Sequence, residues 1–162
     1  MTLDFDPIDE AARQWGLRWG GVPQMHAVTT LMRVQQLVLS RLDALLKPHD
    51  LTFARYEALV LLSFTRSGSL PLGKIGERLQ VHPTSVTPII DRLESAGLVR
   101  RQPHPEDRRA VLAEITEAGR SLVEATTADL IDAGFGLSAL DDAQLGAVSE
   151  LLRGVREAAG DF

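Results

Sequence analysis

The chain has 162 residues, of which 44% are apolar and 24% charged, the composition of one ordinary globular domain. Leu, Ala and Val carry most of the apolar content and aromatic residues make up only 5%, so we expect a mostly helical fold. The absence of cysteine excludes disulfides, cysteine-ligated zinc sites and thiol chemistry. No apolar run approaches the roughly 18 residues that span a bilayer, and the acidic N-terminus lacks the pattern of a signal peptide. We therefore expect a cytoplasmic protein with no membrane partner.

The formal net charge of −5 is unevenly distributed along the chain. Residues 72–109 contain seven basic side chains and five acidic ones, so the acidic excess lies entirely outside this segment. A locally positive segment in an acidic chain is typical of a protein that contacts phosphate with one face only. The excess is small, and by itself it is also compatible with chance.

Two helices are predicted within residues 1–50. Asp6 and Pro7 favour a helix start, because Asp caps free N–H groups and Pro is tolerated at the first helical position; we expect the glycines at 20–21 to end this helix. A long helix is predicted from about Pro23 to Lys47, where apolar residues recur at steps of three and four.

A third helix is predicted to follow Thr52, which is a good N-cap, and to continue to about Thr65. The helix is apolar nearly all round, Phe64 included, so we expect it to be buried. Residues 66–69 are typical of a turn.

Two shorter helices are predicted next, over Leu72–Gln80 and from Pro83 to about Ala96, with a three-residue connection between them. Gly97 stands where a helix C-terminal glycine is expected. The period then changes to that of strands, at 98–102 and 109–115, with a turn-rich tip between them.

Two helices are predicted in the last part of the chain. Thr116 and Glu117 favour a helix start, and this helix is expected to continue toward Phe135. Ser138 is the predicted cap of a last helix that ends at about Ala159.

Two short helices followed by a β-hairpin define a winged helix-turn-helix, whose second helix enters the major groove of DNA. Small hydroxyl side chains stand at the front of that helix, where they can approach bases or phosphates closely, and an arginine one turn further on can reach backbone phosphate. The predicted DNA-contacting residues of the helix are Thr84, Ser85, Thr87, Pro88 and Arg92. The hydroxyl cluster is also compatible with simple helix N-terminal chemistry.

The tip of the hairpin carries Asp107, Arg108 and Arg109. An arginine on a narrow loop can enter the minor groove, where the negative potential is focused, and we expect Asp107 to hold Arg109 by a charge-assisted bond. An ordinary solvated turn is the alternative. Arg100 and Arg101 are expected at the base of this wing.

Several motifs together resemble the MarR (multiple antibiotic resistance regulator) family of bacterial transcription factors. They are Leu79–Thr87, Asp91–Val99, Pro105–Arg109 and Thr116–Gly119, with Arg55 and Tyr56 at the start of the preceding helix. The resemblance implies a homodimer in which residues 1–50 and 116–162 form the dimerisation region and residues 51–115 the DNA-binding lobe. It also implies a repressor of a pseudo-palindromic operator on double-stranded DNA. In this family the Asp-x-Arg of the wing is a DNA motif, which falls on Asp107 and Arg109.

The resemblance further implies release by a small aromatic or anionic effector, bound between the dimerisation region and the lobe. The residues expected near such a ligand are Met25, His26, Thr29, Arg33 and Tyr56. The sequence departs from the family at Pro71, where a capping Ser or Thr is usual, and at Pro88, which removes an N–H inside the recognition helix and predicts a local bend.

Other functions are less well supported by the residues. His82 can either meet a phosphate or cap its helix, and His26, His49 and His104 are scattered, so we expect no metal site and no cofactor. Neither a phosphate-binding glycine loop nor a nucleophile in a recognisable context is present, so we do not expect an enzyme. The alternative to a DNA-binding regulator is a helical dimer with a degenerate wing that binds a ligand or another protein.

Overall fold

The structure is a computed structural model that describes residues 3–107 and 110–162, so Arg108 and Arg109 lie outside the described residues. The elements follow in the order α1 (Pro7–Gly16), α2 (Val22–Leu46), η1 (Lys47–His49), α3 (Phe53–Ser63), β1 (Ser69–Pro71), α4 (Leu72–Leu79), α5 (Pro83–Ser95), β2 (Val99–Pro103), β3 (Val111–Ile115), α6 (Glu117–Asp132), η2 (Gly134–Gly136) and α7 (Asp142–Ala158). A mostly helical chain with one small β-sheet confirms the fold class expected from the sequence. None of the described helices is long and apolar enough to cross a membrane.

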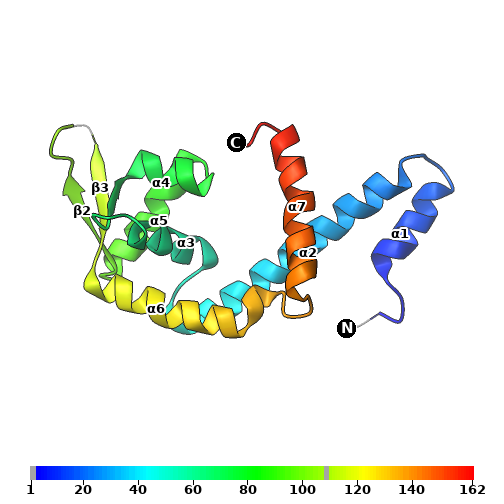
Figure 1. The fold of residues 1–162 in the computed structure, drawn as a ribbon, viewed down its shortest axis with the longest axis horizontal. Helices are drawn as coiled ribbons and strands as arrows, with labels where there is room; N and C mark the ends of the chain where they lie inside the picture. Colours follow the sequence, from blue (N-terminus) through cyan, green and yellow to red (C-terminus); the bar gives the residue numbers. More distant parts are fainter. Residues whose placement is uncertain (1–2, 108–109) are drawn as a thin grey trace.

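The molecule is elongated, with a lobe at one end and helical arms at the other (Figure 1). The long helix α2 connects the two ends, and α1 packs beside it. The lobe contains α3, α4, α5 and the sheet, and α6 leads from the sheet back to α2. The turn η2 packs on both α2 and α6, and α7 follows it.

The sheet is antiparallel with the strand order β1-β3-β2. Strands β2 and β3 are the hairpin predicted from the sequence, with Arg101 opposite Ala113. The sequence predicts only a turn at residues 66–69, whereas in the structure Ser69 begins strand β1. This strand pairs with β3, and Leu70 lies opposite Ala113. Three residues are too few to show an alternating pattern, so only the pairing with a distant strand reveals β1.

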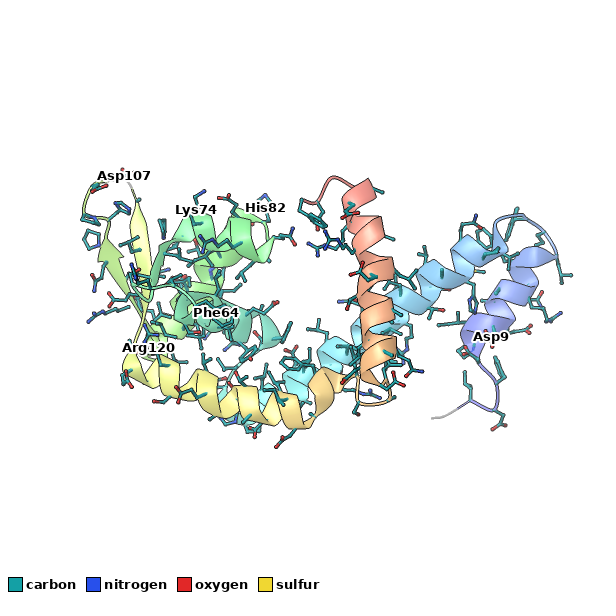
Figure 2. All side chains as sticks on the ribbon, in the orientation of Figure 1. Asp9, Phe64, Lys74, His82, Asp107 and Arg120 are labelled. Atoms are coloured by element: carbon teal, nitrogen blue, oxygen red, sulfur yellow. The ribbon has the colours of Figure 1, made fainter. Side chains whose placement is uncertain are left out.

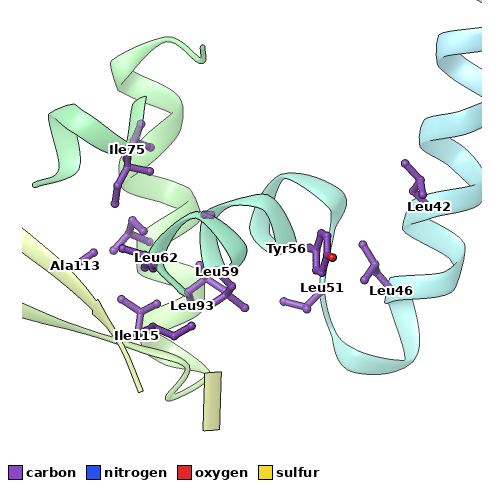
Figure 3. Close-up of a cluster of buried hydrophobic side chains, with 14 of the residues drawn as sticks. Leu42, Leu46, Leu51, Tyr56, Leu59, Leu62, Ile75, Leu93, Ala113 and Ile115 are labelled. Atoms are coloured by element: carbon purple, nitrogen blue, oxygen red, sulfur yellow. The ribbon is translucent and has the colours of Figure 1, made fainter. Parts of the chain in front are cut away.

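The hydrophobic core lies inside the lobe and continues to the end of α2 (Figure 3). Leu59, Leu62, Ile75 and Ile90 are fully buried where α3, α4 and α5 meet. The prediction that Phe64 is buried was wrong: α3 ends at Ser63, so Phe64 is a C-cap residue, and its side chain is 81% exposed.

The predicted caps of three helices are confirmed. The carboxylate of Asp6 accepts from the backbone N–H of Ile8 at 2.7 Å, and Thr52 and Thr116 cap α3 and α6 in the same manner. The first helix nevertheless ends at Gly16, earlier than the predicted stop at residues 20–21.

The start of the last helix differs from the prediction. Ser138 is not its cap; the carboxylate of Asp141 accepts from Gln144 N at 2.8 Å, and Gln144 Oε1 accepts from Asp141 N at 3.0 Å. This reciprocal capping box satisfies two free N–H groups, which a lone Ser cannot do. The preceding helix stops at Asp132 rather than near Phe135, because residues 134–136 all take positive φ angles.

Candidate nucleic-acid interface

The recognition helix α5 has one buried and one exposed face. Val86, Ile90 and Leu93 are at most 2% exposed and pack the helix against the lobe. The opposite face carries the side chains that the sequence predicted to contact DNA, and all of them are exposed: Thr84, Ser85, Thr87, Pro88 and Arg92. Rigid packing behind a polar face presents these groups in a fixed arrangement.

His82 caps α5. Its Nδ1 atom accepts from the backbone N–H of Thr84 at 3.3 Å and lies 2.7 Å from Thr84 Oγ1. Of the two roles that the sequence left open for His82, the structure shows the cap. The contact also fixes the Thr84 hydroxyl at the front of the helix. The preceding turn contains Gln80 in a left-handed conformation, with φ of 54°.

Helix α5 continues from Pro83 to Ser95 through Pro88. Because proline has no N–H, the Thr84 carbonyl cannot accept the helical hydrogen bond that the residue four positions on normally donates. The local bend predicted at Pro88 stays a prediction.

The wing is organised by His104, for which the histidine spacing in the sequence indicates no role. His104 Nδ1 accepts from Glu106 N at 3.2 Å and from Asp107 N at 3.1 Å, and His104 N donates to the carbonyl of Ala110. These bonds place Asp107 at the tip of the hairpin (Figure 2). The sequence signal for this role of His104 is that it stands between Pro103 and Pro105. Because proline has no backbone N–H, His104 is the only one of these three residues that can donate a backbone hydrogen bond.

Arg101 connects the wing to the recognition helix. Its Nη2 atom donates to Asp91 at 2.6 Å, its Nη1 atom to Glu94 at 2.5 Å, and its backbone N–H to Glu94 at 3.0 Å. Burial disfavours the charged guanidinium, but the hydrogen bonds to Asp91 and Glu94 outweigh this and raise the pKa of Arg101. The expected position of Arg101 at the wing base is confirmed, and the connecting role is new.

The neighbouring Arg100 lies on the other face of β2. It donates to Glu114 on β3 at 2.7 Å, which holds the pKa of the Glu114 carboxyl below its usual value. Its contact is therefore across the sheet and not to the recognition helix.

The five residues expected near an effector are not gathered into one pocket of the single chain. Thr29 and Arg33 line a groove of about 640 Å³ between α2 and the segment before α1. Met25 accepts a hydrogen bond from Thr29 through its carbonyl, and His26 pairs with Asp9 at 2.8 Å. Tyr56 lies elsewhere: it is buried in the lobe and bonds to Thr127 on α6.

Large apolar side chains are exposed on the arms of the chain. They lie on α1, α2 and α7 and in the adjoining segments: Trp15, Leu17, Trp19, Val28, Leu31, Met32, Val34, Leu37, Leu39, Val148, Leu151, Leu152 and Val155. A soluble chain rarely leaves so extended an apolar surface in water, so this surface is expected to be covered by a partner.

Among the described residues no group of three His, Cys, Asp or Glu side chains could hold a metal ion.

A helix with a polar face beside a two-stranded wing defines the winged helix-turn-helix class of DNA-binding proteins. The MarR family model matches residues 51–111, which cover the lobe except the last residues of β3. The uncharacterized HTH-type transcriptional regulator YhbI of Bacillus subtilis (strain 168) is 34% identical over 128 residues, which is 74% of this chain and 82% of YhbI.

Two solved structures have the same fold. Sco5413, a MarR family transcriptional regulator from Streptomyces coelicolor, is 56% identical with a TM-score of 0.81, over 88% of this chain and 99% of that one. A mutant MarR from E. coli complexed with operator DNA is 25% identical with a TM-score of 0.66, over 80% and 95% of the two chains. The chain belongs to the MarR family of transcriptional regulators, as its motifs predicted.

Proposed function

We propose that this protein is a homodimeric repressor that binds a pseudo-palindromic operator and is released by a small anionic or aromatic effector in the cytoplasm. The observation that carries the proposal is the exposed hydroxyl and arginine face of α5, held beside the wing by Arg101. In this proposal the base edges of the major groove are contacted by Thr84, Ser85, Thr87 and Pro88. The minor groove and the DNA backbone are contacted by the wing residues Asp107, Arg108 and Arg109.

The proposed dimer uses the arms of the chain. Residues 1–50 and 116–162 carry the uncovered apolar surface of α1, α2 and α7, whereas residues 51–115 form the lobe and its own core. Pairing two chains through the arms covers this surface and leaves one lobe free on each side. A two-fold pair of lobes matches a two-fold pair of half-sites, about one turn of the duplex apart.

The proposed effector site involves the groove that contains Thr29 and Arg33. Val28, Met32 and Phe5 line the same groove, which therefore offers an apolar surface with one guanidinium. The Asp6 carboxylate also borders the groove, where it accepts from the backbone N–H of Ile8. This combination suits an apolar molecule with an anionic group, which the arginine can bind through two parallel hydrogen bonds. Because the groove lies in the dimerisation region, ligand binding there can alter the spacing of the two lobes.

The experiment that tests the function is selection of bound duplexes from a random pool, followed by gel-shift titration with the enriched sequence. We expect enrichment of an inverted repeat and binding at least a thousandfold tighter than to unrelated DNA, on the order of the usual specificity ratio. If no sequence is enriched and low-salt binding is absent, the protein is instead a helical dimer that binds another type of partner.

A further inference from the structure

A recess in the lobe lies between the start of α3 and the second half of α5, and neither the sequence nor the proposed base contacts account for it. Its volume is about 420 Å³, and it is lined by Asp50, Arg55, Arg92, Ser95 and Ala96. Two guanidinium side chains from different helices thus share one opening, which is an arrangement that attracts anions.

The two arginines are held differently. Arg55 Nη1 donates to the backbone carbonyl of Asp50 at 2.7 Å, which fixes the side chain at the recess and leaves its other N–H groups available. Within the described part of the chain, the Arg92 guanidinium makes no hydrogen bond or ion pair. The Asp50 carboxylate also borders the recess, so two positive charges face one negative charge there.

The recess continues the DNA-facing stripe of α5. Thr84, Pro88 and Arg92 are spaced four residues apart and share one exposed face of the helix. Arg92 is eight residues beyond Thr84, which corresponds to about 12 Å along a helix. In helix-turn-helix proteins the N-terminal residues of the recognition helix contact the base edges. With Thr84 in that position, Arg92 and the recess lie farther along the helix, where a long side chain is suited to backbone phosphate.

We propose, on the basis of the function above, that Arg55 and Arg92 form a clamp for the backbone phosphates of duplex DNA. Arg92 was expected from the sequence to contact phosphate; the new element is Arg55, which belongs to α3 and not to the helix-turn-helix. Because the two side chains come from separate helices, a phosphate between them fixes the orientation of the whole lobe on the duplex. The clamp carries no sequence information of its own.

The test is the salt dependence of DNA binding by Arg55→Gln, Arg92→Gln and the control Arg66→Gln. Glutamine keeps a polar side chain with N–H donors but removes the charge. Arg55→Gln and Arg92→Gln should each make the slope of log binding constant against log salt concentration less negative by about 0.9. The ratio of the variant's affinity to that of the wild type should therefore rise about 3.5-fold between 50 and 200 mM salt. Arg66 is exposed just beyond the opposite end of α3, and its variant should keep the wild-type slope.

Two further measurements distinguish a phosphate clamp from a base contact or a damaged fold. Arg55→Lys, which keeps the charge without the planar fork, should restore the slope but not the full affinity. At one fixed low salt concentration, both Gln variants should weaken binding to operator and to unrelated DNA by the same factor, about ten. Unchanged slopes in folded variants, or an effect confined to the operator, would overturn the clamp while the proposed function stands; absent binding by the wild type would remove the function itself.

The same recess could take its phosphate from solution instead of from DNA. Inorganic phosphate alone provides the probe, with the melting temperature of wild type and Arg55→Gln as the readout. The clamp predicts that the two proteins respond equally to phosphate up to tens of millimolar. If phosphate stabilises only the wild type and the DNA salt slope is the same for both, the recess is a free-anion site and the clamp is wrong.

Discussion

The link between the wing and the recognition helix gives the sharpest mutational prediction. Arg101 bonds to Asp91 at 2.6 Å and to Glu94 at 2.5 Å, and its side chain is only 25% exposed. Arg100, the adjacent residue of the same strand, makes one pair with Glu114 and its side chain is 61% exposed. The two arginines therefore form a matched pair for substitution by methionine, which preserves much of the length and removes the charge.

The expected magnitudes follow from exposure. An exposed ion pair contributes about 0.2–1 kcal/mol. Arg100 is fully solvated, so Arg100→Met should change the free energy of unfolding only slightly. Hydrogen bonds to charged groups contribute about 1.5–3 kcal/mol where water is excluded. The energy of the Arg101 ion pairs lies between these limits, because Asp91 and Glu94 are themselves partly solvated. We therefore expect Arg101→Met to lower the free energy of unfolding by about 2 kcal/mol.

The assays are chemical denaturation and operator binding. Without the Arg101 side chain the wing is held beside the recognition helix only by the chain connection and by packing, so its orientation is less fixed and operator affinity should fall by about tenfold, or about 1.4 kcal/mol. The salt slope should not change, because Arg101 is occupied by carboxylates and is not assigned to phosphate. A double-mutant cycle of Arg101→Met with Asp91→Asn should give a coupling energy of about 1 kcal/mol.

Two results would refute this reasoning. Equal losses of stability and affinity for the Arg100 and Arg101 variants would show that the connection to α5 has no special role. A coupling energy near zero between Arg101 and Asp91 would show that their short contact does not contribute to stability.

Two further predictions concern stability. Gly119→Ala should destabilise the lobe strongly, because an added Cβ would lie 2.3 Å from the Leu98 carbonyl oxygen. Gly73→Ala has open space around the added Cβ and should raise stability by up to about 0.5–1 kcal/mol in thermal or denaturant melts. Equal stability changes in the two variants would contradict the close approach at Gly119. Partial desolvation raises the pKa of the Glu57 carboxyl above its usual 4.5, although the residue stays exposed at the surface. The ionised group is therefore slightly less favourable in the folded state, and stability should fall modestly as pH rises through and above this value. Glu57→Gln should therefore increase the melting temperature at pH 7 but not at pH 4, and a uniform change at both pH values would exclude the titration as its cause.

The helix ends and the buried faces of the lobe could be predicted from the sequence. Thr52 and Gly97 carry the chemistry of helix ends, and the apolar stripe of α5 predicts its buried face, so the helix-turn-helix and hairpin could be placed within a few residues. The exposed face of α5 follows directly from the same periodicity.

The features that the sequence did not predict depend on residues far apart in the chain. Strand β1 exists because β3 offers it a partner, and the ion pairs of Arg101 join positions seven and ten residues apart across a change from helix to strand. The recess brings together Arg55 of α3 and Arg92 of α5, which are 37 positions apart in the sequence. Such pairings have no local period, so composition and spacing could not reveal them.

The most direct test of the account is a hydroxyl-radical footprint on the selected operator, combined with the mass of the complex by sedimentation. The account predicts two chains on each duplex and two equivalent protected regions, with centres separated by one helical turn of about 10–10.5 base pairs or a multiple of it. A single chain bound to a single protected half-site at saturation would contradict it.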